Sequence, residues 1–405
     1  MIKRTIIEYL KKYHFKYKKM VFLTGPRQVG KTTLAKSLLM QRGSGKLYYD
    51  WDDFTTRKRI AKNPYFFNED IEQYKIKKPM LVFDEIHKYH KWKNYLKAVS
   101  DTYKDDISIF VTGSAKMDIF KKGGDSLFGR YFQYNLYPLS VGELCGNKNI
   151  PKIEKLLDNL PFKNCGDVCD SLFSFNGFPE PFITQKNNFL VRWRNERKRL
   201  IIREDIRDIS ALRQIAGLEK LMELLPAKIG SMLSINSLRE DLEVAFETVK
   251  LWLNLLTYTH YIFSVRPYEK SLVRSIKKET KVYFWDWSEL DKDGYKFENF
   301  IACHLQKTVA LYNDFGLGDL DLNFIRDKQK REVDFLVTAK NEPVYLIEAK
   351  LNDLVPSANL IYFMGKLDIK KGYQIVNIKK YFKVHQTRNG FVYVISADQF
   401  LPGLL

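Results

Sequence analysis

The sequence predicts an α/β protein in which a parallel sheet comes first and a small mixed α/β domain comes last. Apolar runs at 20–23 and 80–83 are typical of buried parallel strands, and a helix pattern follows a glycine-bracketed loop after the first run. A helix and several strand-like segments after residue 288 predict the last domain. We therefore expect four regions: 1–145, a linker and helical region at 146–218, a helical module at 219–287, and 288–405.

The loop after the first strand matches the spacing G-x-x-x-x-G-K-T. Glycines let backbone N–H groups turn toward phosphate oxygens, and the next helix adds its positive amino-terminal end. Lys31 can reach the β- and γ-phosphates, and the Thr32 hydroxyl can bind Mg²⁺. The alternative is a turn that matches by accident, which the flanking strand and helix argue against. The predicted nucleotide-binding residues are Gly25, Pro26, Arg27, Gln28, Val29, Gly30, Lys31, Thr32 and Thr33.

A second motif follows the apolar run at 80–83, which ends in Asp84 and Glu85. This is a Walker B pattern. Asp84 is predicted to hold Mg²⁺ through its water shell, and Glu85 to polarise the attacking water. The competing interpretation is an acidic helix cap after a strand.

The third strand, within 107–116, is followed by Thr112 and Ser114. A polar group at the end of this strand can sense the γ-phosphate or the water near it, and a plain turn is the alternative. Arg130 precedes another strand-like segment. It could reach a nucleotide phosphate in its own subunit or in a neighbour, or it could form an ordinary ion pair. Ser114 and Arg130 are the predicted sensors.

The composition favours a polyanionic partner. Lys and Arg number 67 against 48 Asp and Glu, a net charge of +19, which indicates nucleic acid before membrane. A lysine-rich proteome with a solvated surface is the alternative. An uninterrupted apolar stretch of about 18 residues, which a spanning helix needs, is absent from the sequence, and residues 1–19 lack a signal-peptide core. Four widely placed cysteines predict reduced thiols in a cytosol and no zinc site.

Four features, GPRQVGKTT, LVFDEIHK, VTGS and GR…YPLS, together resemble a family of predicted bacterial and archaeal ATPases of the AAA+/STAND type. The resemblance covers essentially the whole chain. It implies ATP and Mg²⁺ as ligands and a parallel sheet in which the strand of the catalytic acid lies between the first strand and the sensor strand. It also implies a helical and winged-helix region followed by an uncharacterised carboxyl-terminal domain. The resemblance leaves the role of Arg130 open.

The middle of the chain is helical. Residues 146–165 are polar and are predicted to be a linker, and 190–210 predicts a basic helix that lies either on phosphates or in solvent. Three helices and two strands after residue 219 predict a winged helix, whose recognition helix would be Phe246 to Thr257. That helix is poor in the side chains that read base edges. Contact with the DNA backbone and plain packing therefore both stay open.

Acidic residues in the last domain predict a second site. Glu348 and Lys350 are two apart on a strand and point the same way, Asp334 lies on the preceding strand, and Glu298 lies on the helix before. The pattern resembles the PD-(D/E)xK nucleases, closest to their archaeal junction-resolving branch, although the Pro-Asp of that name is absent. The resemblance implies Mg²⁺ or Mn²⁺ on the three acids, with Lys350 as a catalytic residue. Ordinary strand-end charges are the alternative.

We therefore predict a cytoplasmic ATPase that acts on DNA, with a metal-dependent nuclease-like domain at its end. Glu85 and Lys350 are the predicted catalytic residues, and the predicted metal ligands are Thr32, Asp84, Glu298, Asp334 and Glu348. A homo-oligomer is expected if Arg130 acts on a neighbour, and a membrane partner is not expected. The alternative is a nucleotide-controlled switch or signalling ATPase whose last domain binds DNA or protein without cleaving it.

Overall fold

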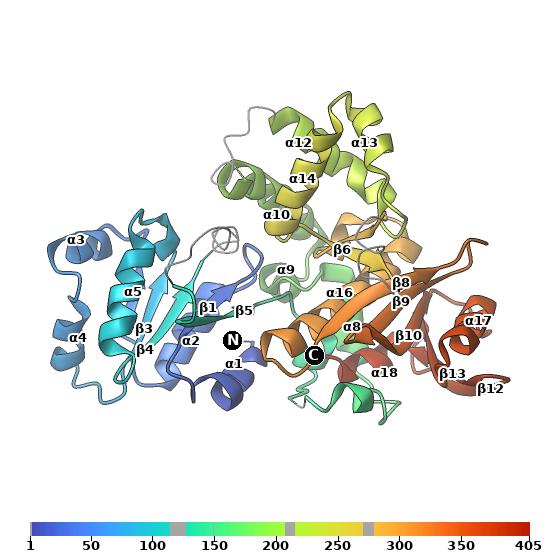
Figure 1. Cartoon of the computed structure of the whole chain (residues 1–405), viewed down its shortest axis with the longest axis horizontal. Helices are drawn as coiled ribbons and strands as arrows, with labels where there is room; N and C mark the ends of the chain where they lie inside the picture. The colour runs from blue at the N-terminus through green and yellow to red at the C-terminus, as the bar shows by residue number, and fades with distance from the viewer. Residues whose placement is uncertain (1, 114–126, 149, 207–214, 270–278) are drawn as a thin grey trace. The chain divides into compact units, whose positions relative to one another are not determined.

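The structure is a computed structural model that describes residues 2–113, 127–148, 150–206, 215–269 and 279–405 (Figure 1). Two compact units can be distinguished. One comprises Arg4–Tyr137 together with residues 203–206, and the other contains Pro138–Ile202 and the described chain from 215 onward. Each unit is described by itself below.

The first unit is built on a five-stranded parallel sheet, which confirms the predicted fold class. Its strands are β1 (Met20–Thr24), β2 (Tyr48–Asp50), β3 (Met80–Asp84), β4 (Ser108–Thr112) and β5 (Tyr131–Asn135), in the order β2-β3-β4-β1-β5. The order implied by the resemblance was wrong, because β4 lies between β1 and β3. Thr112, at the end of β4, is paired in register with both Leu23 and Asp84. The carboxyl ends of the three strands therefore meet at one edge of the sheet.

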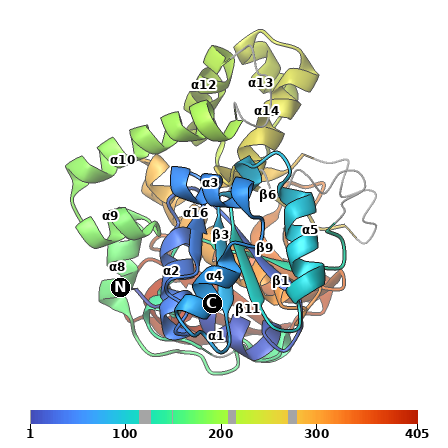
Figure 2. The same cartoon turned by 90° about the vertical axis from the view of Figure 1, so that its left-hand side faces the viewer.

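Helices cover both faces of this sheet, because side chains alternate along each strand. Figure 2 shows α2 (Lys31–Gln41) and α5 (Trp92–Tyr103) on opposite sides of the strands. Phe22 and Phe83 pack with α5, α3 (Phe54–Lys62) and α4 (Phe67–Gln73) in one buried cluster. Before β1 the chain forms α1 (Ile6–Tyr9) and a π-helical turn (Leu10–His14), and a 3₁₀ turn at Ile86–Lys88 follows β3.

The second unit begins with helices that pack on one another and on the short helices and turns beside a larger sheet. They are α7 (Val141–Leu144), α8 (Gly166–Phe175), α9 (Pro179–Thr184) and α10 (Asn187–Leu200), and a π-helical stretch, Ile201–Ile206, continues α10. The predicted linker 146–165 is tied to the unit, because Leu156 and Leu157 are buried and the Tyr345 hydroxyl donates to the carbonyl of Ile153 in a 3₁₀ turn, Ile153–Lys155. Cys145 and Cys165 form a disulfide, so the expectation of four reduced thiols was wrong for this pair.

Three helices and a hairpin follow. The helices are α12 (Ile215–Leu224, with a 3₁₀ turn at Leu225–Lys228), α13 (Ile235–Leu242) and α14 (Phe246–Tyr258), and β6 (Ile262–Pro267) pairs antiparallel with β7 (Lys281–Phe284). This hairpin is not a separate wing, because β6 also pairs in parallel with β8 at Arg266 and Pro267. The two strands are therefore the end of the large sheet.

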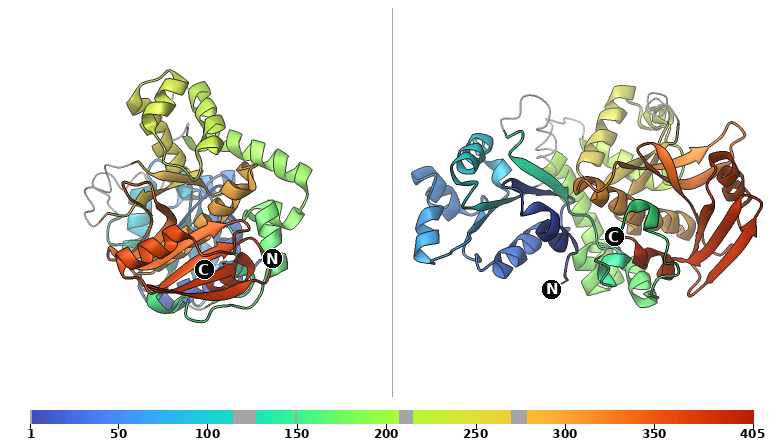
Figure 3. Two further views of the ribbon diagram at one scale, coloured as in Figure 1. Left: turned by 90° about the vertical axis from the view of Figure 1, so that its right-hand side faces the viewer. Right: turned by 60° about the horizontal axis from the view of Figure 1, so that its bottom comes forward.

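The large sheet has eight strands in the order β12-β13-β11-β10-β9-β8-β6-β7. Its later strands are the orange to red arrows in Figure 3. Its further strands are β8 (Leu320–Arg326), β9 (Glu332–Ala339), β10 (Glu342–Lys350), β11 (Lys371–Val376), β12 (Phe382–Thr387) and β13 (Gly390–Ser396). Leu336 and Leu346 pack on α17 (Ala358–Leu367), whereas Val337 and Ile347 lie with Leu305 of α16 (Asp293–Asp314). The two helices thus cover opposite faces. A 3₁₀ turn (Trp287–Glu289) precedes α16, and α18 (Ala397–Phe400) and a 3₁₀ turn (Leu401–Gly403) follow β13.

Candidate functional site

The glycine loop of the first unit has the backbone that its sequence predicts. Gly30 has a φ of 97° and is the residue just before α2, and Gly25 has a φ of 140°. A β-carbon at Gly25 would lie 2.2 Å from the carbonyl oxygen of Leu136. Both positions therefore require glycine. Gly30 and Gly25 have backbone angles that other residues rarely adopt, and Gly25 is also approached closely by the backbone of Leu136.

Lys31, the first residue of α2, is held inside this loop. Its Nζ donates to the carbonyl oxygens of Gly25 at 2.9 Å and Pro26 at 2.8 Å. Burial lowers the pKa of Lys31, and the nearby Glu85 and Asp205 carboxylates oppose that shift. An ammonium group within a loop of backbone amides is suited to bind a phosphate, because the negative charge of the phosphate would pair with the positive charge of the ammonium group.

Asp84, at the end of β3, is contacted by three hydroxyl groups. The Thr32 and Tyr48 hydroxyls donate to its Oδ2, at 2.7 and 2.5 Å, and the Thr112 hydroxyl donates to its Oδ1. Burial, followed by the hydrogen bond to Asp84, raises the pKa of Tyr48. The structure therefore brings together the predicted metal ligands Thr32 and Asp84 and adds two hydroxyls that are distant in sequence.

Glu85 follows Asp84 in the left-handed backbone region, with a φ of 53°, and its N–H donates to the carbonyl of Thr112. Burial raises the pKa of Glu85, and Lys88 and Lys31 oppose the shift. Burial alone would lower the pKa of Arg27, but Asp205 raises it, with smaller contributions from Glu204 and Glu85. A carboxylate with a raised pKa near a phosphate site is the type of group that can accept a proton from water.

The Arg27 side chain makes contacts that the sequence analysis missed. Its Nε and Nη2 lie 3.1 and 2.7 Å from the two carboxylate oxygens of Asp205, and its Nη1 lies 2.8 Å from Oε2 of Glu204. Asp205 is only 7% exposed. Both acids belong to the stretch that continues α10, so residues from the middle of the chain lie at the glycine loop.

Of the two predicted sensors, the structure describes only Arg130. Ser114 falls outside the described residues. The carbonyl of Arg130 accepts the N–H of Met20, the first residue of β1, and its guanidinium pairs with Asp101 of α5 at 2.6 and 2.9 Å. The glycine loop follows the other end of β1, about 15 Å of strand away. The structure therefore does not bring Arg130 to the loop of its own chain.

In the second unit, the predicted metal ligands Glu298, Asp334 and Glu348 lie close together, but lysine side chains pair with them. Asp334 Oδ2 accepts the N–H of Ala349 at 3.0 Å, and Lys350 Nζ lies 2.8 Å from Glu348 Oε1. Burial, followed by the charge of Asp334, raises the pKa of Glu348. Asp334 and Glu348 are thus neighbours on adjacent strands, as the sequence predicts.

An unpredicted lysine lies among these acids. Lys281 Nζ is 2.7 Å from Glu332, 3.3 Å from Glu298 and 3.5 Å from Asp334, and it is buried. Burial alone would lower the pKa of Lys281, but the three carboxylates outweigh it and raise the pKa. Within the described parts of the chain, no group of three or more His, Cys, Asp or Glu side chains is arranged to hold a metal ion.

Figure 2 shows the basic helix α10. Most of the cations on this helix make contacts inside the second unit. Arg194 donates to the carbonyl of Ser288, Lys198 pairs with Glu289 at 2.5 Å, and Arg197 is buried with its guanidinium 4.3 Å from the ring centre of Phe178. These contacts give the helix a structural role in the unit, which neither of the two interpretations from the sequence, phosphate contact or a solvated helix, included.

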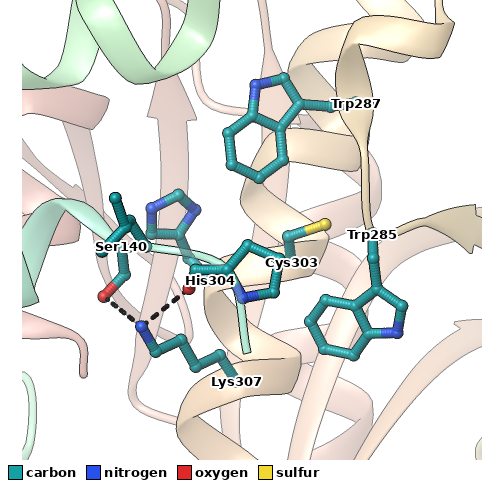
Figure 4. Close-up of a pocket in the computed structure, with 8 residues that line it drawn as sticks. Ser140, Trp285, Trp287, Cys303, His304 and Lys307 are labelled. Carbon is teal, nitrogen blue, oxygen red and sulfur yellow. Dashed lines mark hydrogen bonds between the residues drawn. The ribbon is translucent and has the colours of Figure 1, made fainter. Parts of the chain in front are cut away.

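A small buried pocket lies where Pro138, Leu139 and Ser140 pack against α16. Figure 4 shows Ser140, His304 and Lys307 in this pocket, which Trp285 and Trp287 also line. Lys307 Nζ donates to the Pro138 carbonyl at 2.9 Å, and pairs with Glu143 Oε2 at 2.8 Å. His304 Nε2 accepts the N–H of Val141, so its Nδ1 carries the proton and donates to Phe300 O. Each polar group named here is satisfied, which indicates a structural site.

None of the helices in the described ranges is both long and apolar enough to cross a membrane.

Three family models match the chain. A model described as an AAA domain matches residues 17–145, and two models each described as a domain of unknown function, DUF8612 and DUF4143, match 169–290 and 293–399. The first match includes the glycine loop and the Asp84–Glu85 pair. The other two cover the helices and the eight-stranded sheet.

Three similar proteins each carry the name uncharacterized protein. One from Mycobacterium tuberculosis is 22% identical over 339 residues, which cover 80% of this chain and 68% of that protein. One from Haemophilus influenzae is 21% identical over 349 residues, or 80% of each chain, and one from Methanocaldococcus jannaschii is 25% identical over 295 residues, or 66% of this chain and 60% of that protein. The chain thus carries an AAA-type nucleotide-binding domain followed by two domains whose function is unknown.

Proposed function

We propose that the protein hydrolyses ATP with Mg²⁺ at the glycine loop and that the nucleotide state controls how its second unit binds DNA. The observation that carries the ATPase assignment is the Thr32–Asp84 contact of 2.7 Å beside the half-buried Lys31 side chain, whose ammonium group lies in the glycine loop. It places two hard oxygen donors next to a positively charged phosphate cradle. That donor set fits Mg²⁺, which takes its other ligands from phosphates and water.

Each residue of the site has a role in this proposal. The loop amides and the start of α2 bind the phosphates, and Lys31 leaves the carbonyls of Gly25 and Pro26 to contact them. Thr32 and Asp84 would hold Mg²⁺, which neutralises phosphate charge when bound. Glu85 orients the attacking water and accepts its proton, a step that the raised pKa of this carboxyl favours.

The DNA part of the proposal rests on charge. A net charge of +19 produces a positive field that attracts a polyanion, and neutralised phosphates release counterions. Because most cations of α10 make contacts inside the unit, we expect DNA to contact exposed lysines elsewhere and not this helix.

The second unit could act on DNA by cutting it or by binding alone. The neighbouring positions of Asp334 and Glu348 on β9 and β10 are the observation that favours metal-dependent cleavage. The pairing of Lys281 with Glu298 and Asp334 favours binding alone. We propose the second, an ATP-controlled switch that binds DNA without cleaving it.

Two measurements test this function. ATP binding and phosphate release should be measured for wild type and for Lys31→Ala, with Lys62→Ala, which changes an exposed lysine of α3, as the control. We expect both to be lost only in Lys31→Ala. If the Lys31→Ala variant binds ATP like wild type, the ATPase assignment is wrong.

A separate set of measurements tests whether the protein binds DNA. ATP hydrolysis with and without DNA, and DNA affinity at several salt concentrations, should be compared with and without ATP. We expect affinity to fall steeply with salt and to differ between the nucleotide states. No DNA stimulation, together with binding that ignores salt, would exclude DNA as the partner while leaving the ATPase assignment intact.

A further inference from the structure

The acidic cluster of the second unit does not have the arrangement that a divalent cation requires. Its resemblance to a nuclease centre implies a metal held by Glu298, Asp334 and Glu348. In the structure, two of these three acids, Glu298 and Asp334, instead face the same ammonium group, Lys281 Nζ, together with Glu332. The third acid faces Lys350. The predicted ligands are therefore divided between two lysines.

The charge balance also argues against a metal. Each carboxylate has a cationic partner: Arg326 pairs with Glu332 at 2.9 Å, in addition to Lys281. Four carboxylates and three cations leave a single net negative charge, and these residues are Glu298, Glu332, Asp334, Glu348, Lys281, Arg326 and Lys350. A buried Mg²⁺ would bring two more positive charges into a cluster that is already close to neutral, and ions in such surroundings must be paired.

Glu298 is also enclosed by its neighbours. The Tyr283 hydroxyl donates to its Oε1 at 2.8 Å, and a β-carbon at Gly230 would lie 3.1 Å from its Oε2. The Glu298 side chain is 15% exposed and Lys281 is 1% exposed. The chain around residue 230 and the start of β7 therefore pack directly against this carboxylate, where a metal ion and its water shell would need space.

Lys281 connects parts of the fold that are not hydrogen-bonded neighbours. It belongs to β7, whereas its partners belong to α16 and β9, and the sheet order separates β7 from β9 by β8 and β6. The backbone of Lys281 also bridges to Met232, after the turn that follows α12. The cluster thus fixes the hairpin and the helical module on the large sheet.

From these contacts we propose that the Lys281 ammonium group takes the place of a divalent cation in the second unit. The cluster holds β7, α16 and β9 together, and the unit neither requires nor binds a metal there. This proposal does not depend on ATP hydrolysis, because all of its residues lie in the second unit.

The test measures Mn²⁺ binding to the full, nucleotide-free chain by the paramagnetic resonance signal of free Mn²⁺. Wild type and Asp334→Asn should give the same binding curve. Lys281→Met should gain a Mn²⁺ site with at least tenfold higher affinity than wild type has, and Lys281→Met/Asp334→Asn should lose it again. Lys370→Met, which removes an exposed lysine paired with Asp368, is the control and should match wild type.

Two results would overturn the proposal. One is a Mn²⁺ site in wild type that Asp334→Asn removes, and the other is a Lys281→Met chain that folds but gains no site. Because loss of Lys281 leaves buried acids unpaired, the variant could fail to fold. Thermal unfolding of wild type and Asp334→Asn with and without Mn²⁺ decides that case: equal shifts support the proposal, and a stabilisation confined to wild type contradicts it.

Discussion

Arg27 in the glycine loop forms a two-pronged ion pair with Asp205, with N···O distances of 2.7 and 3.1 Å. Glu204 contacts the same guanidinium at 2.8 Å. Paired geometry of this kind is among the stronger polar contacts in proteins, and the near-complete burial of Asp205 limits screening by solvent. An arginine that the sequence predicts to contact a phosphate thus pairs with two carboxylates.

These carboxylates should weaken ATP binding, because they neutralise Arg27 and repel the phosphates. The variant Glu204→Gln/Asp205→Asn should therefore bind ATP several-fold more tightly than wild type, measured by titration with a fluorescent ATP analogue. Glu196→Gln, which changes an exposed acid on α10, is the matched control and should bind like wild type. Unchanged or weaker ATP binding in the double variant would show that the pair does not compete with nucleotide.

Glu85→Gln should separate nucleotide binding from hydrolysis. The amide keeps the shape of the side chain but cannot accept a proton from water, so turnover should fall at least about 100-fold. ATP affinity should stay within a few-fold of wild type, because Lys31 and the loop amides are unchanged. Glu72→Gln, an exposed acid on α4, serves as the control. Turnover like wild type in Glu85→Gln would move the catalytic role to another residue.

Exposed cations on the edge of the large sheet should contribute to DNA binding. Lys383 lies on β12, and Lys380 and Arg388 lie just before and just after this strand. The exposed rings of Phe382 and Phe391 lie at the same edge of the sheet. Bases can stack on such rings while the cations contact phosphates. Replacing the three cations by Ala should lower DNA affinity and reduce the slope of log K against log salt by about two to three.

The control for this edge removes the same charge from the first unit. Lys58, Lys62 and Lys78 are exposed there and are replaced together by Ala. This variant should keep most of the DNA affinity and of the salt slope. Equal losses in both triple variants would mean that net charge, and not the edge strand, determines binding.

The nucleotide site could be predicted from the sequence because its residues are close along the chain. Gly25 to Thr33 is one strand–loop–helix segment, and Asp84 and Glu85 end one strand. The Arg27–Asp205 pair joins residues 178 positions apart, which no local pattern reveals. The order of the strands was predicted wrongly for the same reason, since motifs identify strands but not their neighbours.

The acidic cluster shows the same limit. The spacing of Glu348 and Lys350 and the position of Asp334 predicted that these residues meet, and they do. Lys281 lies in an ordinary strand sequence before the long helix, and only the return of the hairpin to the large sheet brings it to the acids. The sequence therefore predicted which acids lie together, whereas the lysine that pairs with two of them is determined by the tertiary fold.

His304 should make the second unit sensitive to acid. Burial lowers the pKa of His304 from 6.5 to about 3, so the folded unit keeps the imidazole neutral while an unfolded chain takes up a proton below pH 6.5. The stabilisation is therefore complete above pH 6.5 and is lost as the pH falls toward 3. Between pH 7 and pH 5 the loss from this residue should be about 2 kcal/mol.

Urea unfolding followed by tryptophan fluorescence measures this effect, because Trp287 lies 6.0 Å from the His304 ring. In His304→Gln the amide can still accept the N–H of Val141 but does not titrate. The difference in free energy of unfolding between pH 7 and pH 5 should therefore be about 2 kcal/mol smaller than in wild type. His90→Gln changes an exposed histidine and should leave this difference as in wild type. If His304→Gln loses as much stability as wild type over this range, the acid sensitivity arises from other groups.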